Sequence, residues 1–231
     1  MIDPGERVVL TDIEGTIADI AFVRKVLFPY ARRSLPDFLR ERGDEPEVRT
    51  QLRSTAELSG VPADDIEAVL EVLCTWIDED RKATPLKALQ GMIWKHGYAE
   101  GDFVAHLYPD AHRWLAARQA EGVGLYVYSS GSIAAQELYF RYNEFGDLRP
   151  WFSGYFDTTS GPKKEPDSYR AIALAIDADP DRIAFLSDSA EELDAAQVAG
   201  MRTAQLCRDG LAPSGRHPAF KDFDSIELET L

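Results

Sequence analysis

The sequence has few of the features that mark several protein classes. It contains two cysteines in 231 residues, Cys74 and Cys207, and they share no CxxC or Cys/His spacing. We therefore expect two reduced thiols and no structural zinc site. No apolar run reaches the roughly 18 residues that a membrane-spanning helix needs, so we expect no transmembrane segment. The N-terminal stretch lacks the basic start, apolar segment and cleavage site of a secretory signal, which predicts a cytoplasmic protein.

Basic residues are scarce relative to acidic ones. There are 25 Lys and Arg against 40 Asp and Glu, a net charge of −15. This charge repels nucleic-acid phosphates and anionic membrane surfaces, so we expect no nucleic acid and no membrane as partners. Because the chain also lacks a repeated apolar face, a monomer is expected. With 45% hydrophobic residues, the chain can bury a sizeable core.

Short apolar runs predict a parallel sheet in the second half of the chain. Such runs, apolar without alternation, are typical of strands buried on both faces. Predicted helices separate them, and strand–helix alternation of this kind indicates a doubly wound α/β fold. The predicted strands are 7–11, 124–128, 182–186 and 203–206, and the predicted helices are 110–119, 133–142, 168–176 and 191–199.

A long helical region interrupts this pattern after the first strand. Only helical periodicity occurs there, with one apolar stripe running from Ile66 to Ile77 and another from Leu86 to Ile93. A region of this length is too long for a simple crossover between two strands. We therefore predict an α/β core formed by 1–20 and 103–231, with 21–102 as an inserted helical cap.

Two acidic residues directly follow the first predicted strand. Asp12 and Glu14 stand two positions apart, and Gly15 allows a sharp turn behind them. Ligands of open α/β sheets bind at the carboxyl ends of strands, so these carboxylates are candidates to face a ligand. The plainer alternative is an acidic strand-to-loop turn, which is common in soluble proteins.

Three serines follow the second predicted strand, at the expected start of a helix. Hydroxyls and free backbone N–H groups at such a position form an anion site. Ser129, Ser130 and Ser132 are all present. The plainer alternative is that the serines only cap the helix, although one serine suffices for a cap and three are present.

Two lysines and three further acids complete the set of candidate residues. Lys163 and Lys164 stand in a loop before a helix, where a lysine can neutralise a phosphoryl group or be a solvated loop residue. Asp188, Glu191 and Glu192 follow the third predicted strand. Their oxygens suit Mg²⁺, although glutamates also favour the N-terminus of a helix. Together the four groups predict a phosphoryl-transfer site, in which a carboxylate attacks phosphorus and cations hold the phosphate.

The order of these motifs resembles the haloacid dehalogenase superfamily of aspartate-nucleophile phosphatases. Longer strings resemble, within it, the enolase-phosphatase E1 (acireductone synthase) family, in which Glu stands at position 14 where most of the superfamily has Asp. The likeness extends roughly over 8–200. The strings are DIEGT at 12–16, IAFV at 20–23, LFPY at 27–30, LKALQGMIW at 86–94, YSSGS at 128–132 and GYFDT at 154–158.

The resemblance implies a role for each acid of the candidate site. Asp12 would be the nucleophile that becomes aspartyl phosphate, with its carboxylate also on Mg²⁺. Glu14 would be the general acid/base, with its main-chain carbonyl on the metal. Asp188 would be the third protein ligand of one Mg²⁺ per subunit, and Glu192 would lie in the outer shell of the metal.

The other implied roles concern the substrate. Ser129 and Ser130 would hold the phosphate, and Lys163, preferred over Lys164 by its spacing in the loop, would bridge phosphate and nucleophile. The implied substrate is 2,3-diketo-5-methylthiopentyl 1-phosphate, which is enolised and dephosphorylated to 1,2-dihydroxy-3-oxo-5-methylthiopentene in methionine salvage. The candidates for lining the cap are Trp94, His96 and Tyr98, although His96 is equally well explained as a structural histidine.

Other functions stay open from the sequence. A magnesium-dependent phosphatase of another small phosphate ester would share every motif except Glu14 and the cap strings. A phosphoaspartate receiver domain also uses an α/β sheet, but it would carry its phosphorylated Asp in mid-chain and no helical insertion. A non-catalytic binding protein would not need the intact set of acids, serines and lysine.

Overall fold

The computed structural model describes residues 7–228 and divides into two compact units. The first, here called the α/β unit, runs to Ile20 and resumes at Ala105; the second, the helical unit, is Ala21–Val104. The sequence-based division placed the insertion at 21–102. Its core range also takes in residues 1–6 and 229–231, which lie outside the described residues. Within 7–228, no helix combines the length and apolar character that crossing a membrane requires.

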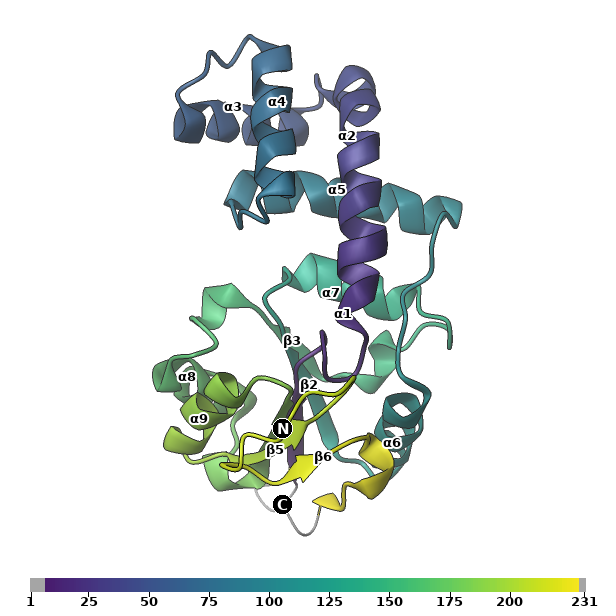
Figure 1. Ribbon diagram of the computed structural model, residues 1–231, viewed down its shortest axis with the longest axis vertical. Coiled ribbons are helices and arrows are strands. Elements are labelled where there is room, and N and C mark those ends of the chain that lie inside the picture. The colour runs from purple at the N-terminus through teal and green to yellow at the C-terminus, as the bar shows by residue number, and fades with distance from the viewer. Residues whose placement is uncertain (1–6, 229–231) are drawn as a thin grey trace. The chain divides into compact units, whose positions relative to one another are not determined.

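The α/β unit contains a six-stranded parallel sheet, which confirms the predicted fold class (Figure 1). Its spatial order is β3-β2-β1-β4-β5-β6, so β1 lies between β2 and β4. Every residue of β1, β2 and β4 is buried, as their apolar runs predicted. The strands are β1 (Val8–Thr11), β2 (Gly124–Tyr128), β3 (Gly154–Phe156), β4 (Ile183–Ser187), β5 (Arg202–Leu206) and β6 (Ala219–Phe220).

Four helices connect these strands and cover the two faces of the sheet. Along the chain, β2 and β3 are added on one side of β1, and β4 and β5 are then added on its other side. Right-handed crossovers therefore place the first two helices on one face and the last two on the other, and Figure 1 shows α8 and α9 on the side of the sheet opposite α6. The helices are α6 (Pro109–Ala120), α7 (Ile133–Arg141), α8 (Pro166–Ile176) and α9 (Ala190–Val198).

Two strands of the sheet were missing from the sequence-based prediction. β3 has three residues and β6 has two, and neither is fully buried. Strands this short contain no extended apolar run, so the pattern that identified the other four is absent. The four predicted strands are present, each within one residue of its expected ends.

The helical unit consists of helices packed around apolar side chains, as the periodicity predicted. Asp65 caps α4 by accepting a hydrogen bond from the Ala68 N–H at 3.0 Å, and Gly60 ends α3 in the left-handed conformation. Leu73 and Leu89 are completely buried. The helices are α1 (Ile20–Phe22), a π-helical turn (Val23–Leu27), α2 (Phe28–Arg42), α3 (Pro46–Ser59), α4 (Ile66–Asp78) and α5 (Thr84–Glu100).

Candidate active site

Asp12 lies at the carboxyl end of the central strand β1, where ligands of parallel sheets bind. Its side chain is buried, and its N–H donates to the Leu186 carbonyl of the neighbouring strand at 2.9 Å. The chain then turns through Gly15, whose φ of +78° is a conformation that a side chain disfavours. β1 therefore presents the Asp12 carboxylate at a fixed place on the edge of the sheet.

The loop after β4 packs directly against this turn. A Cβ added at Gly15 would lie 2.2 Å from Asp188 Oδ2, so only glycine leaves room for that carboxylate. The Asp188 N–H donates to Thr16 Oγ1 at 2.9 Å. The two acidic loops are therefore in close contact, and Thr16, to which no role was given in the sequence analysis, links them.

Lys163 lies buried between two carboxylates. Its Nζ is 2.6 Å from Asp12 Oδ1 and 2.6 Å from Glu192 Oε2. Burial alone would lower the pKa of this ammonium, but the charges of Asp12 and Glu192 raise it above the ordinary value of lysine. The Tyr169 hydroxyl donates to the Lys163 carbonyl at 2.7 Å and holds the loop in place. Lys163 is thus a permanent cation beside Asp12.

The neighbouring residues of the same motifs lie at the surface. Lys164 is exposed and pairs with Glu191, which is exposed as well. Lys163 and Glu192 therefore lie largely buried in the candidate site, whereas Lys164 and Glu191 form an ion pair at the surface.

The site holds more negative than positive charge. Burial and the nearby Asp12 carboxylate raise the pKa of Asp188 to about 6 and the pKa of Glu192 to about 7. Glu192 also accepts a hydrogen bond from Ser187 Oγ at 3.1 Å. One ammonium does not balance these carboxylates, so the geometry favours a further cation.

The residues present fit a hard divalent cation. Asp12 and Asp188 provide carboxylate oxygens, the donors that such cations prefer, and the tight cradle at Gly15 directs Asp188 toward the Asp12 loop. Within residues 7–228, no three His, Cys, Asp or Glu side chains form a metal-binding group. The predicted ligand set, in which Glu14 contributes its main-chain carbonyl beside Asp12 and Asp188, stays a prediction.

Glu14 and Ser129 meet across the sheet edge. Ser129 Oγ donates to Glu14 Oε2 at 3.1 Å and accepts from the Gly131 N–H at 3.2 Å. Burial, followed by the charge of Asp12, raises the pKa of Glu14 above its ordinary value. A carboxyl group with a raised pKa is suited to act as a general acid.

Helix capping leaves Ser129 and Ser130 outside the helix. The N-cap of α7 is Ser132, whose Oγ accepts from the Ala135 N–H at 3.3 Å. Ser129 is buried, and Ser130 next to it is exposed. The capping requirement therefore accounts for Ser132 alone, and the two preceding serines need another explanation.

Asp157, which carried no role in the sequence analysis, joins two loops of the site. Its carboxylate accepts hydrogen bonds from the Ile133 N–H at 3.2 Å and from the Thr159 N–H at 2.8 Å. It thus ties the serine loop to the loop that leads to Lys163. An available signal was its place directly after a strand, but that strand, β3, was too short to predict.

The three predicted lining residues lie on α5 in the helical unit. The Trp94 indole donates to the Leu27 carbonyl at 2.9 Å, and Tyr98 is buried with its ring edge-on to Phe103. His96 is exposed. Trp94 and Tyr98 thus contribute to packing within the helical unit, and the lining role of all three stays a prediction.

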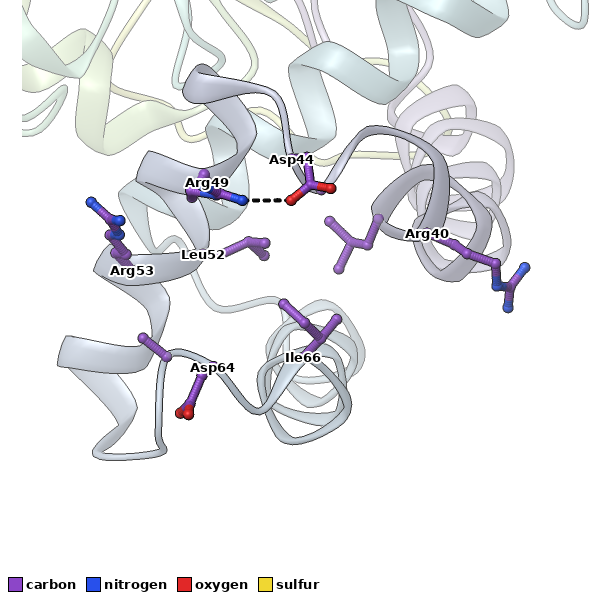
Figure 2. Close-up of a pocket in the computed structure, with 10 residues that line it drawn as sticks. Arg40, Asp44, Arg49, Leu52, Arg53, Asp64 and Ile66 are labelled. Carbon is purple, nitrogen blue, oxygen red and sulfur yellow. Dashed lines mark hydrogen bonds and ion pairs between the residues drawn. The ribbon is translucent and has the colours of Figure 1, made fainter.

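A pocket of about 560 Å³ lies within the helical unit, between α2, α3 and the start of α4 (Figure 2). Leu52 and Ile66 form part of its apolar lining, whereas the side chains of Arg40 and Arg53 point away from it. None of the residues predicted for the active site lines this pocket.

Comparison with known proteins gives consistent results. The haloacid dehalogenase-like hydrolase family matches residues 6–200. Enolase-phosphatase E1 of Pseudomonas aeruginosa is 55% identical over 96% of this chain and 99% of its own length. Enolase-phosphatase E1 of Azotobacter vinelandii is 55% identical over 96% of this chain and 97% of its own.

A solved structure extends the similarity to three dimensions. The crystal structure of the UTR4 protein from Saccharomyces cerevisiae superposes with a TM-score of 0.81 at 32% identity, covering 96% of this chain and 100% of that one. The CbbY protein of Rhodobacter sphaeroides, crystallised with phosphate, has a TM-score of 0.59 at 20% identity over 95% of this chain and 96% of its own, which indicates a shared fold. The chain therefore belongs to the haloacid dehalogenase-like hydrolases and, within them, to the enolase-phosphatase E1 family.

Proposed function

We propose that this protein is a bifunctional, Mg²⁺-dependent enolase-phosphatase of methionine salvage. Its substrate would be 2,3-diketo-5-methylthiopentyl 1-phosphate, and its products the acireductone 1,2-dihydroxy-3-oxo-5-methylthiopentene and phosphate. The observation that carries the proposal is the pair Asp12 and Glu14 on one turn, with the first beside the Lys163 ammonium and the second bonded to the Ser129 hydroxyl. Relatives named for this activity share more than half of their residues with the chain.

Dephosphorylation would proceed in two steps at Asp12. In the first, a carboxylate oxygen of Asp12 attacks phosphorus, the bond between phosphorus and the ester oxygen breaks, and Glu14 donates a proton to the leaving alkoxide. In the second, water attacks the aspartyl phosphate, its proton passes to Glu14, and phosphate leaves with the Asp12 carboxylate restored. Glu14 thus alternates between acid and base, for which its raised pKa is suited.

Lys163, Ser129 and Ser130 would stabilise the charge that develops on the phosphoryl oxygens. Lys163 stays protonated because two carboxylates surround it, so it offers a full charge without reorganisation. Glu192 keeps this ammonium in place next to Asp12. Ser129 would turn its hydroxyl from Glu14 to a phosphate oxygen when substrate binds.

The proposed Mg²⁺, one per subunit, would be held by the carboxylates of Asp12 and Asp188 and by the Glu14 carbonyl. When bound, it offsets the repulsion between the Asp12 carboxylate and the substrate phosphate and polarises the substrate carbonyl for enolisation. The outer-shell position predicted for Glu192 is compatible with its contact to Lys163. We further propose that the enzyme acts as a monomer in the cytoplasm, in keeping with its charge of −15.

A two-channel assay tests this function. Purified protein with Mg²⁺ and a 2,3-diketo 1-phosphate would be followed anaerobically for phosphate release and for enediol absorbance in the ultraviolet. We expect both signals, and we expect EDTA to abolish both. Phosphate without an enediol signal would replace the proposal by a phosphatase of another ester, and silence in both channels from folded, Mg²⁺-loaded protein would favour a binding role.

A further inference from the structure

The segment after β5 carried no role in the sequence analysis, and the family match ends at residue 200. Arg208, two residues past the end of β5, nevertheless lies largely buried in the α/β unit. Its guanidinium pairs with Asp110 at 2.7 Å, and the two side chains are 10% and 14% exposed. Removing both charges of such a pair from water costs folding free energy, so a buried ion pair at this place suggests a role besides stability.

The guanidinium of Arg208 is held on several sides. It lies 4.2 Å from the centre of the Tyr108 ring and 5.5 Å from that of Phe223. Asp110, its partner, also accepts a hydrogen bond from the Phe223 N–H at 2.8 Å. In addition, the Arg208 Nε–H donates a hydrogen bond to the carbonyl of Thr16 at 3.2 Å. The guanidinium is thus fixed by its neighbours, and through it the main chain of the Asp12 loop is tied to α6 and the C-terminal segment.

Thr16 transmits this contact to the second acidic loop. Its carbonyl accepts from Arg208, while its hydroxyl accepts from the Asp188 N–H at 2.9 Å. Within β5, Gln205 Nε2 donates to the Asp188 carbonyl at 3.2 Å. Both acidic loops are therefore held by residues in the last part of β5 or just after it.

We propose that Arg208 is a positioning residue that sets the spacing between the Asp12 and Asp188 loops and thereby the affinity for Mg²⁺. The inference rests on the proposed Mg²⁺-dependent function. Among these contacts, Arg208 reaches the acidic loops through the Thr16 carbonyl. Partners that orient metal ligands in this way typically contribute about 10–100-fold to metal affinity.

Charge and geometry predict opposite effects of removing Arg208. Loss of the guanidinium leaves the Asp110 carboxylate unpaired and makes the surroundings more negative, which by Coulomb attraction alone would strengthen Mg²⁺ binding. Loss of the contact to Thr16 loosens the ligand spacing and weakens binding. The sign of the change in Mg²⁺ affinity therefore separates a positioning role from an electrostatic one.

The test compares Arg208→Met with Arg113→Met as a matched control. Arg113 also joins α6 to the C-terminal segment through an ion pair, to Asp224 at 2.7 Å, but both side chains are more than half exposed. Thermal unfolding measured against Mg²⁺ concentration, without substrate, gives the Mg²⁺ affinity. We expect about 10–100-fold weaker binding in Arg208→Met and an unchanged affinity in Arg113→Met.

Activity provides a second readout. The Mg²⁺ concentration for half-maximal phosphate release should rise in Arg208→Met by the same factor as the dissociation constant, while kcat at saturating Mg²⁺ stays near that of the unmodified protein. Should Arg208→Met fail to fold, Arg208→Lys keeps the cation beside Asp110 but lacks the Nε–H donor to Thr16. We expect a smaller loss of Mg²⁺ affinity in that variant, in the same direction.

Two outcomes overturn the proposal in distinguishable ways. If the unmodified protein shows Mg²⁺-dependent unfolding, and folded Arg208→Met or Arg208→Lys binds Mg²⁺ as tightly or more tightly, the positioning role is wrong and the proposed function stands. If the unmodified protein unfolds independently of Mg²⁺, the metal dependence of the proposed function is wrong, and the role of Arg208 is rejected with it.

Discussion

The two units of this protein bury different kinds of side chain. In the part of the chain that the structure describes, the helical unit buries Thr55 and Gln90 as its polar residues and no charged one. Its ion pairs, such as Arg42 with Glu45 and Arg49 with Asp44, lie at the surface. The α/β unit, by contrast, buries Asp12 and Lys163 at the edge of its sheet.

This difference separates the requirements of folding from those of chemistry. Burying a charge costs free energy, whereas replacing a buried ion pair by apolar residues is often neutral or stabilising. Among its described residues, the helical unit buries no charged side chain and so avoids this free-energy cost. The buried charges of the α/β unit therefore indicate residues kept for function, and substitutions in the two units should differ in whether they affect turnover or stability.

The largest effect is expected from Asp12→Asn, which removes the nucleophile with almost no change in shape. Phosphate release should fall by at least about 10⁴-fold, while the far-ultraviolet circular dichroism stays that of the folded protein. Asp78→Asn in the helical unit, which breaks an exposed pair with Arg32, serves as the matched control and should keep full activity. Appreciable turnover by Asp12→Asn would contradict the assignment.

The adjacent lysines offer the next test, since they differ in burial and not in chemistry. Lys163→Met should lower kcat by about 10²–10³-fold because the phosphoryl oxygens lose a fixed cation. Lys164→Met, which removes an exposed pair with Glu191, should leave kcat within about twofold. Equal losses in the two variants would show that the buried position carries no special role.

Leu73→Ala addresses the helical unit, where stability should respond. Leu73 is fully buried in α4, and truncation of such a side chain costs about 2–5 kcal/mol of unfolding free energy. Urea denaturation followed by circular dichroism measures this loss. A change below about 1 kcal/mol would mean that the helical unit is not held together by this packing.

Mg²⁺ should stabilise the protein more at about pH 8 than at about pH 5.5. Burial and the Asp12 carboxylate raise the pKa of Asp188 to about 6 and that of Glu192 to about 7. The folded, metal-free protein then keeps protons that the unfolded chain has released, so on this account its stability falls as pH rises from about 4 to about 7. Mg²⁺ competes with those protons. Thermal unfolding with and without Mg²⁺ at both pH values checks this, and an equal gain at the two would contradict it.

The smallest effect is expected from Arg49→Gln at the surface of the helical unit. Its pair with Asp44 is more than half exposed on both sides. Exposed pairs contribute less than about 1 kcal/mol, so neither the melting temperature nor kcat should change measurably. A marked loss of activity would reveal a role for this face that its exposed charges do not indicate.

Much of the fold could be predicted because it depends on local patterns. Buried parallel strands are uninterrupted apolar runs, and helices show a regular apolar stripe, so β1, β2, β4 and β5 and the helical insertion were recognisable. β3 and β6 form because neighbouring strands offer hydrogen-bond partners, and such pairing leaves little trace in two or three residues.

The candidate site shows the same limit. Asp12, Glu14 and Asp188 closely follow predicted strands, and Lys163 stands in a loop before a predicted helix, which made these residues visible in the sequence. Residues that act through the main chain, such as Arg208 and its partner Asp110, carry no pattern of their own. Their roles depend on a carbonyl or N–H of a distant residue, and only the folded structure brings these groups together.

The central claim is that Asp12 becomes phosphorylated, and rapid acid quenching tests it most directly. Protein mixed with Mg²⁺ and the diketo phosphate would be quenched during turnover, digested and examined by mass spectrometry. We predict one added phosphoryl group on the peptide that contains Asp12, and its absence from Asp12→Asn. Phosphate release at the normal rate with that peptide unmodified throughout turnover would contradict the account.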